Sequence, residues 1–207
     1  MKKVMIMASM IFVLASCEKT TEGISNRTTA AESDDVVAAG TLNFTFNSSK
    51  QGWTTENGAT SVLSPQGNPT GCVKGTDDGS ATSWYFAAPA SLLTGLQTKS
   101  GNFLLKFDLK APSTNNSNTA DIIIVSPNRT IVLDVANDPN GTTWTSYSAA
   151  LTNAANWRIG TLAGAKATNA QIKSVLKNIT ALWIKGEFST AAANAGFLDN
   201  VNISKIL

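Results

Sequence analysis

The chain has 207 residues, of which 14% are charged and 43% hydrophobic, and its formal net charge is +2. This length predicts one folded domain with appended segments. The chain has no His, which excludes Ser-His-Asp and Cys-His triads and histidine-based zinc sites. Lys and Arg are scattered along the sequence, so we expect no nucleic-acid partner, because duplex binding needs clustered cations that neutralise phosphates.

Residues 1–16 have the pattern of a secretory signal, in which Lys2 and Lys3 precede an apolar run over residues 4–14. The segment leads into the letters LASC at residues 14–17, which resemble the bacterial lipobox, where the Cys thiol is acylated and the chain is cleaved just before it. The apolar run is shorter than the about 20 residues that a membrane-spanning helix needs. We therefore predict a lipoprotein attached to the membrane through acylated Cys17, in the bacterial cell envelope at the outer membrane or cell surface. An ordinary signal peptide and a retained membrane anchor are the alternatives.

Residues 17–40 read as the lipidated Cys followed by a flexible tether, because they are rich in Thr, Ser, Asn, Ala and acidic residues and have almost no large apolar side chain. Cleavage before Cys17 removes two lysines and leaves equal numbers of acidic and basic side chains. Cys72 is then the one remaining thiol. With no His to activate it, we expect a buried, unreactive cysteine.

From residue 41 onward the sequence predicts short strands separated by turn-rich segments. Apolar residues alternate with polar ones over residues 42–46 and, most clearly, over residues 102–109. Two β-branched runs at 122–125 and 131–135 lie on either side of the turn-forming residues 126–129, which predicts a β-hairpin. Further strands are expected at residues 83–87, 142–151, 181–188 and 196–203.

One helix interrupts this pattern. Thr168 and Gln171 fit a capping box, and the apolar residues that follow fall on one helical face, namely Ile172, Val175, Leu176 and Ile179. About eight or nine strands and one short helix predict an all-β domain over residues 41–207, an antiparallel β-sandwich of jelly-roll type. A parallel sheet would need a crossover helix between most strands.

The order of landmarks along residues 41–204 is more specific than the number of strands. In chain order they are Phe46, Gly52-Trp53, residues 84–89 (WYFAAP), 101–110 (GNFLLKFDLK), 144–147 (WTSY), Trp157-Arg158, the helix at 167–176, 179–182 (ITAL), 186–188 (GEF) and 198–201 (LDNV). This succession resembles the laminin B domain, also called laminin domain IV type A. The resemblance implies a jelly roll similar to carbohydrate-binding modules and galactose-binding-like domains, and it implies no catalytic activity.

Candidate ligand-binding residues follow from strand alternation, which assigns a set of polar side chains and one tryptophan to the face opposite the core. They are Lys106, Asp108, Asp134, Trp183, Lys185 and Glu187. A tryptophan among charged side chains can stack on a sugar ring while the carboxylates accept protons from its hydroxyls. The alternative is an ordinary face of cross-strand ion pairs, with Trp183 covered by a loop or by the helix.

A structural calcium ion is a further expectation from the resemblance, and no other cofactor is expected. Asp199 in the last strand stands where related jelly-roll modules hold calcium, usually together with an acidic residue just after the first strand. Here that second position is Asn47. Calcium takes about six to eight oxygen ligands, and an amide supplies an oxygen without its charge. The alternative is that Asp199 caps a turn.

These observations predict a non-catalytic cell-envelope lipoprotein that binds an extracellular partner, a polysaccharide in the first place. The alternative is a protein-interaction or structural accessory module on the outer surface. An enzyme acting on glycosides ranks third. Asp108, Asp134 and Glu187 each share a predicted face with a lysine, which should lower the pKa of a carboxyl that a general acid needs raised.

Overall fold

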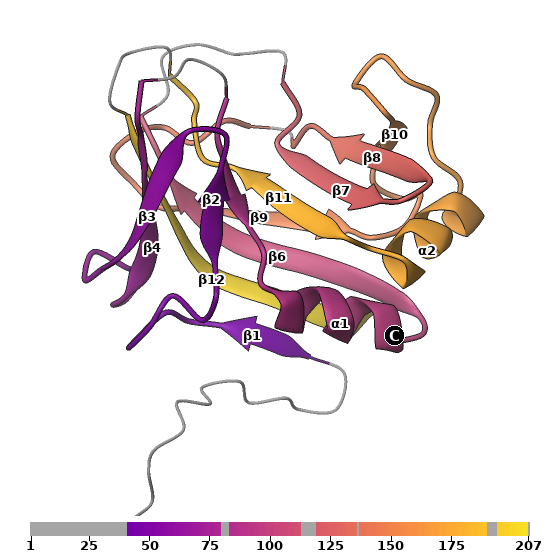
Figure 1. Cartoon of the computed structure of the whole chain (residues 1–207), viewed down its shortest axis with the longest axis horizontal. Helices are drawn as coiled ribbons and strands as arrows, with labels where there is room; N and C mark the ends of the chain where they lie inside the picture. Colours follow the sequence, from indigo (N-terminus) through magenta and orange to yellow (C-terminus); the bar gives the residue numbers. More distant parts are fainter. Residues whose placement is uncertain (1–40, 80–82, 113–118, 136, 190–193, 207) are drawn as a thin grey trace, which may run out of the picture. The chain divides into compact units, whose positions relative to one another are not determined.

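The computed structural model describes residues 41–79, 83–112, 119–135, 137–189 and 194–206. The predicted signal segment, Cys17 and the tether lie outside these residues. The described chain forms two antiparallel β-sheets packed face to face and two short helices, α1 and α2 (Figure 1). The predicted all-β sandwich is therefore confirmed. Neither described helix is long and apolar enough to cross a membrane.

The first sheet has the strand order β3-β4-β12-β6-β9, with β1 paired to β12 off this path. Its strands are β1 (Leu42–Phe44), β3 (Ala59–Ser64), β4 (Cys72–Asp77), β6 (Asn102–Lys110), β9 (Thr145–Ala150) and β12 (Ala195–Ile206). The long β12 pairs with β6 on one side, and β4 and β1 pair with successive parts of its other side. The last strand of the chain thus joins most of the sheet.

The second sheet has the order β10-β8-β7-β11-β5-β2. Its strands are β2 (Thr54–Glu56), β5 (Tyr85–Ala87), β7 (Ile122–Ser126), β8 (Arg129–Leu133), β10 (Arg158–Ile159) and β11 (Ala181–Lys185). The predicted hairpin is confirmed as β7 and β8, whose pairing closes at Ser126 and Arg129. Strands β2, β3, β4 and β10 were not predicted. β2 and β10 have only three and two residues, and β3 and β4 show no regular alternation of apolar and polar residues.

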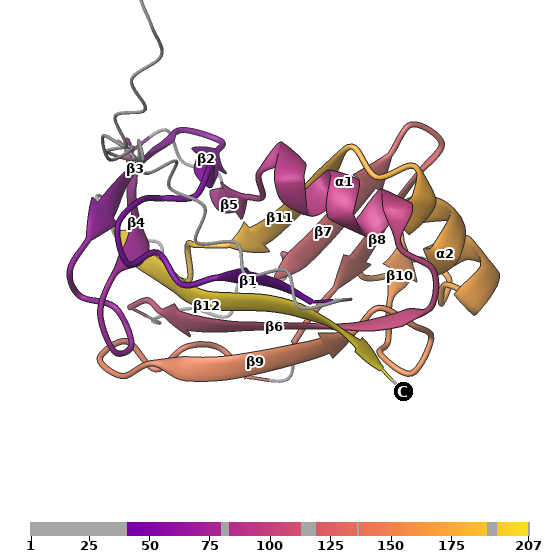
Figure 2. The same ribbon diagram turned by 90° about the horizontal axis from the view of Figure 1, so that it is seen from below.

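The predicted helix is confirmed as α2 (Asn169–Lys177), with both hydrogen bonds of the capping box between Thr168 and Gln171. The prediction of a single helix is wrong, because α1 (Ala90–Thr98) directly follows Pro89. Leu92 and Leu96 of α1 lie one turn apart and are buried. The two helices lie side by side at one end of the sandwich (Figure 2).

Both sheets contribute alternating side chains to one core. The largest fully buried apolar side chains are Trp53, Trp84, Trp157, Phe44, Phe46, Phe86, Phe107, Phe188, Leu92, Leu96 and Leu105. Cys72 is buried and free, as predicted.

The indole of Trp84 fills space that three glycines leave open. A Cβ atom on Gly75, on Gly186 or on Gly196 would overlap or press against its six-membered ring. Gly75 and Gly196 belong to β4 and β12 of the first sheet, whereas Gly186 directly follows β11 of the second. Trp84 therefore packs where the backbones of the two sheets come close together, at Gly186 and Gly196. Its ring meets Phe86 edge-on at a centroid distance of 5.0 Å.

We predict that Gly186→Ala lowers the free energy of unfolding by about 1–3 kcal/mol, because the added methyl group overpacks the core against Trp84. Urea unfolding followed by tryptophan fluorescence measures this. In a Trp84→Phe background, the shorter phenyl ring does not extend as far as the outer atoms Cζ3 and Cη2 of the indole. The same substitution should therefore destabilise the protein less. An equal effect in both backgrounds would contradict the steric explanation.

Candidate functional site

The residues predicted to form a polar binding face lie on two different sheets. Lys106 and Asp108 belong to β6 in the first sheet, whereas Trp183 and Lys185 belong to β11 in the second. Asp134 follows β8 and Glu187 follows β11, both beside the second sheet. The expectation that they share one face is wrong, because alternation shows which side of its own sheet a residue occupies but not to which sheet the strand belongs.

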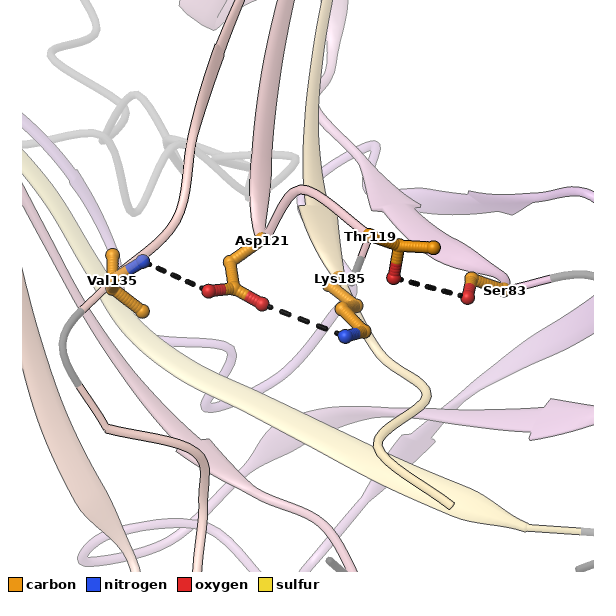
Figure 3. A network of polar contacts seen from close by, with 5 residues as sticks. All are labelled: Ser83, Thr119, Asp121, Val135 and Lys185. Atoms are coloured by element: carbon orange, nitrogen blue, oxygen red, sulfur yellow. Dashed lines mark hydrogen bonds and ion pairs between the residues drawn. The ribbon is translucent and has the colours of Figure 1, made fainter. Parts of the chain in front are cut away.

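Lys185 is not on an open face, as alternation suggested, but is 1% exposed. Its Nζ atom lies 3.7 Å from Oδ1 of Asp121, which is equally buried, and 4.6 Å from the ring centroid of Phe188. The other oxygen of Asp121 accepts the backbone N–H of Val135 at 2.8 Å (Figure 3). The ammonium is therefore desolvated but has a counter-ion and an aromatic ring as compensation.

Burial raises the pKa of Asp121 to about 7, with a further rise from a hydrogen bond with the side chain of Asp134. The N–H of Val135 and the charge of Lys185 lower it only in part. Burial and the nearby Asp77 also raise the pKa of Glu187. The expectation that a lysine lowers the pKa of each candidate carboxyl is wrong for Glu187, because burial has the larger effect.

Trp183 is partly exposed on the outer side of the second sheet. Its ring lies 6.3 Å from that of Tyr85, and it pairs across the sheet with Ala87 and Ile123. Lys185 and Asp134 are therefore not beside it as open polar partners, since the first is buried and the second lies beyond the end of β8. Its role in ligand binding stays a prediction.

An exposed row of lysines and aromatic rings crosses the outer side of the first sheet, and sequence reasoning missed it. It consists of Lys74 in β4, Phe197 in β12, Lys110 in β6 and Trp144 just before β9, and we call it the lysine–aromatic row. Phe197 pairs in register with Lys74 on one side and with Lys110 on the other. All four side chains are partly exposed.

Cation–π contacts hold the row together. Nζ of Lys110 lies 4.6 Å from the ring centroid of Phe197 and 5.2 Å from that of Trp144. Nζ of Lys74 lies 5.9 Å from the same Phe197 ring. Such contacts fix long lysine side chains over ring faces while leaving their N–H groups open to solvent. The row can stack against a planar or pyranose ring and donate hydrogen bonds to its oxygens.

Buried polar contacts lie beside the row. Oδ2 of Asp108 accepts the side-chain amides of Asn200 and Asn68 at 2.8 and 3.2 Å. The two oxygens of Asp199 accept the backbone N–H groups of Asn68 and Asn200 at 2.6 and 2.7 Å. This capping fixes a loop to a bulge in β12, where Asn200 has a φ of 50°. Burial raises the pKa of Asp199 to about 6, although both N–H groups lower it.

The calcium expectation involved Asn47 and Asp199. Asn47 is exposed and its side chain donates to Oγ1 of Thr45, while both oxygens of Asp199 already accept N–H groups. Within the part of the chain that the structure describes, no group of three or more His, Cys, Asp or Glu side chains could hold a metal ion. Calcium binding therefore stays a prediction, with Asp199 serving as a cap in this structure.

Comparisons with known proteins bear on the fold. The family model for Laminin B (Domain IV) matches residues 85–205, more than half of the chain. The L4b domain of human laminin alpha-2 is similar with a TM-score of 0.57 at 14% identity, over 81% of this chain and 98% of that one. The CBM22-1 xylan-binding domain of Paenibacillus barcinonensis Xyn10C has a TM-score of 0.50 at 12% identity, over 80% of this chain and 95% of that one. The carbohydrate-binding module CtCBM11 has a TM-score of 0.52 at 14% identity, over 83% of this chain and 99% of that one. No curated protein matches the sequence.

We predict that the free energy of unfolding falls as the pH rises from about 4 to about 7. Asp121 and Asp199 have pKa values of about 7 and about 6 in the folded protein, against about 3.9 in an unfolded chain. Between these values the folded protein holds protons that the unfolded chain releases, so rising pH favours unfolding. Urea midpoints across this range should decline and then level off above about pH 7. Asp199→Asn should flatten the decline below about pH 6, and a midpoint that rises over the whole interval would contradict the assignment.

Proposed function

This chain belongs to the Laminin B (Domain IV) family, and from that premise we propose that its sandwich is a non-catalytic binding module whose ligand is a glycan. The lysine–aromatic row is the observation that carries the proposal. It presents two aromatic rings and two ammonium groups, all partly exposed, on one side of a sheet. Sugar rings stack on aromatic faces through their C–H groups, and their hydroxyls accept hydrogen bonds from ammonium groups.

The backbone beneath the row makes it a rigid platform. Its residues stand on β4, β12 and β6, whose neighbours along each strand, Val73, Leu198 and Leu109, are at most 1% exposed and point into the core. Binding groups carried on paired strands lose little conformational freedom when a ligand arrives. The fold supports the proposal too, because two structural neighbours are a xylan-binding domain and a carbohydrate-binding module.

The arrangement of carboxyl groups supports binding without catalysis. Glycosidases place two carboxyls at least about 5 Å apart on either side of the scissile bond. Asp108 lies on the first sheet, whereas Asp134 and Glu187 lie beside the second. Asp121 is buried and already paired with Lys185 and the N–H of Val135.

We also propose that the protein is a lipoprotein of the bacterial cell envelope, attached at the outer membrane or cell surface. Residues 1–16 would be removed, Cys17 would carry the acyl chains, and residues up to 40 would tether the domain of residues 41–207. The LASC sequence at residues 14–17 supports this proposal. Two or more acyl chains give durable attachment, whereas one is marginal.

We predict that Trp144→Ala and Phe197→Ala each weaken glycan binding about tenfold, because each removes a stacking surface. Affinity electrophoresis in gels containing xylan, mixed-linkage β-glucan or a uronic acid polymer measures the retardation. Trp183→Ala is the matched control, since Trp183 is also partly exposed but lies on the other sheet.

Loss of retardation in Trp183→Ala with retention in the other two variants would move the site to the second sheet, where the sequence first placed it. Retardation by no polysaccharide would contradict glycan binding. Capture of an extracellular protein that depends on the same side chains would then favour the alternative, a protein-interaction module.

We predict that Cys17→Ser abolishes metabolic labelling with palmitate and releases the protein from the membrane fraction. The serine variant keeps the apolar run at 4–14, so a retained membrane anchor would leave the protein in the membrane fraction. Labelling that persists in Cys17→Ser would contradict acylation at this residue.

A further inference from the structure

The acidic side chains of the folded domain gather at one of its two ends. Residues 79–107 and 139–186 contain no Asp or Glu, and these segments include both helices. The acidic residues gather where β7 and β5 begin and where β4, β8 and β11 end, at the end away from the helices. They include Glu56, Asp77, Asp121, Asp134 and Glu187. We call the opposite end, which carries α1 and α2, the helical end.

A cavity of about 390 Å³ lies at the helical end, between α1, α2 and the start of β6. Its apolar lining includes Leu96, Phe103 and Leu176, and its polar lining includes Lys99, Lys173 and Lys177. No acidic residue lines it, and none of the three lysines forms an ion pair with a described residue. The side chain of Lys205 lies against Gly101 at the same cavity.

The chain also enters the domain at this end. Leu42 in β1 pairs with Ile203 near the end of β12, and its side chain lies against Gly95 of α1. Figure 2 shows β1 running beside β12, with α1 and the C-terminus near its start. A tether from acylated Cys17 would therefore reach the domain beside the lysines.

We propose that the helical end binds the phosphate headgroups of anionic lipid, with one headgroup in the cavity between α1 and α2. The lysines offer point charges to phosphate oxygens, and the apolar lining accommodates the glycerol and upper acyl carbons. A basic patch beside the acyl chains adds electrostatic attraction to anionic lipid. The inference rests on the proposed acyl anchor, since that anchor brings this end to the bilayer.

This contact leaves the glycan platform free. The lysine–aromatic row contains Lys110 at the last position of β6, whereas β6 begins with Asn102 at the helical end. Phe197 likewise lies near the start of β12, at the far end from Ile206. Lipid contact at the helical end and glycan contact at the row therefore use opposite parts of the first sheet.

The test uses residues 18–207, which lack the acylated Cys17 of the mature chain, and cosedimentation with vesicles. We expect binding to phosphatidylglycerol in phosphatidylcholine, none to phosphatidylcholine alone, and weakening by added salt. The triple variant K99Q/K173Q/K177Q should lose on the order of a hundredfold in partitioning, because each lysine near an anionic surface contributes about fivefold. It should keep its retardation in polysaccharide gels.

The matched control is K74Q/K106Q/K110Q, which removes the same charge from the outer side of the first sheet. It should keep vesicle binding and lose glycan retardation, so failure of this inference and failure of the proposed function give different results. Equal losses of vesicle binding in the two triple variants would overturn the site. Binding of inorganic phosphate without vesicle binding would overturn the lipid assignment.

Discussion

The close approach of the two sheets around Trp84 is the constraint on which the rest of the domain depends. Gly186 and Gly196 leave room for the indole, and each is adjacent in sequence to a residue of another site. Lys185 comes just before Gly186 and is directed to its buried partner Asp121. Phe197 comes just after Gly196 and points outward into the lysine–aromatic row. Residues next to this packing contact thus take part in both the interior ion pair and the exposed platform.

The sequence predicted those elements whose formation depends on neighbouring residues, through alternation, turn residues or helix caps. Alternation specified β6, β-branched runs around a turn specified the β7–β8 hairpin, and a capping box specified the start of α2. Helix α1 was not predicted, because Pro89 was read as the end of a strand and the buried pair Leu92 and Leu96 covers only one helical turn. Strand β3 was not predicted, because it lies at the edge of its sheet and its apolar and polar residues do not alternate.

The candidate site was less predictable, because it depends on which strands are neighbours. The lysine–aromatic row requires the order β4-β12-β6-β9, in which the pairs of neighbours are far apart in the sequence. Lys185 looked like an outward residue by alternation, yet Asp121 and Phe188 cover it. Alternation correctly assigned Lys185 to the outer side of β11. Its burial depends on residues outside that strand, Asp121 before β7 and Phe188 after β11.

The pairing of β1 with β12 has a mechanical consequence for a domain held at its N-terminus. A load between the tether and a ligand on the far part of the first sheet runs along the axis of β1, from Leu42 towards Phe44. The hydrogen bonds between antiparallel strands lie perpendicular to that axis, so the load shears all of them together and does not peel them off one by one. In a domain anchored and bound as proposed, the pairing of the short β1 with β12 would therefore resist such a load by shear.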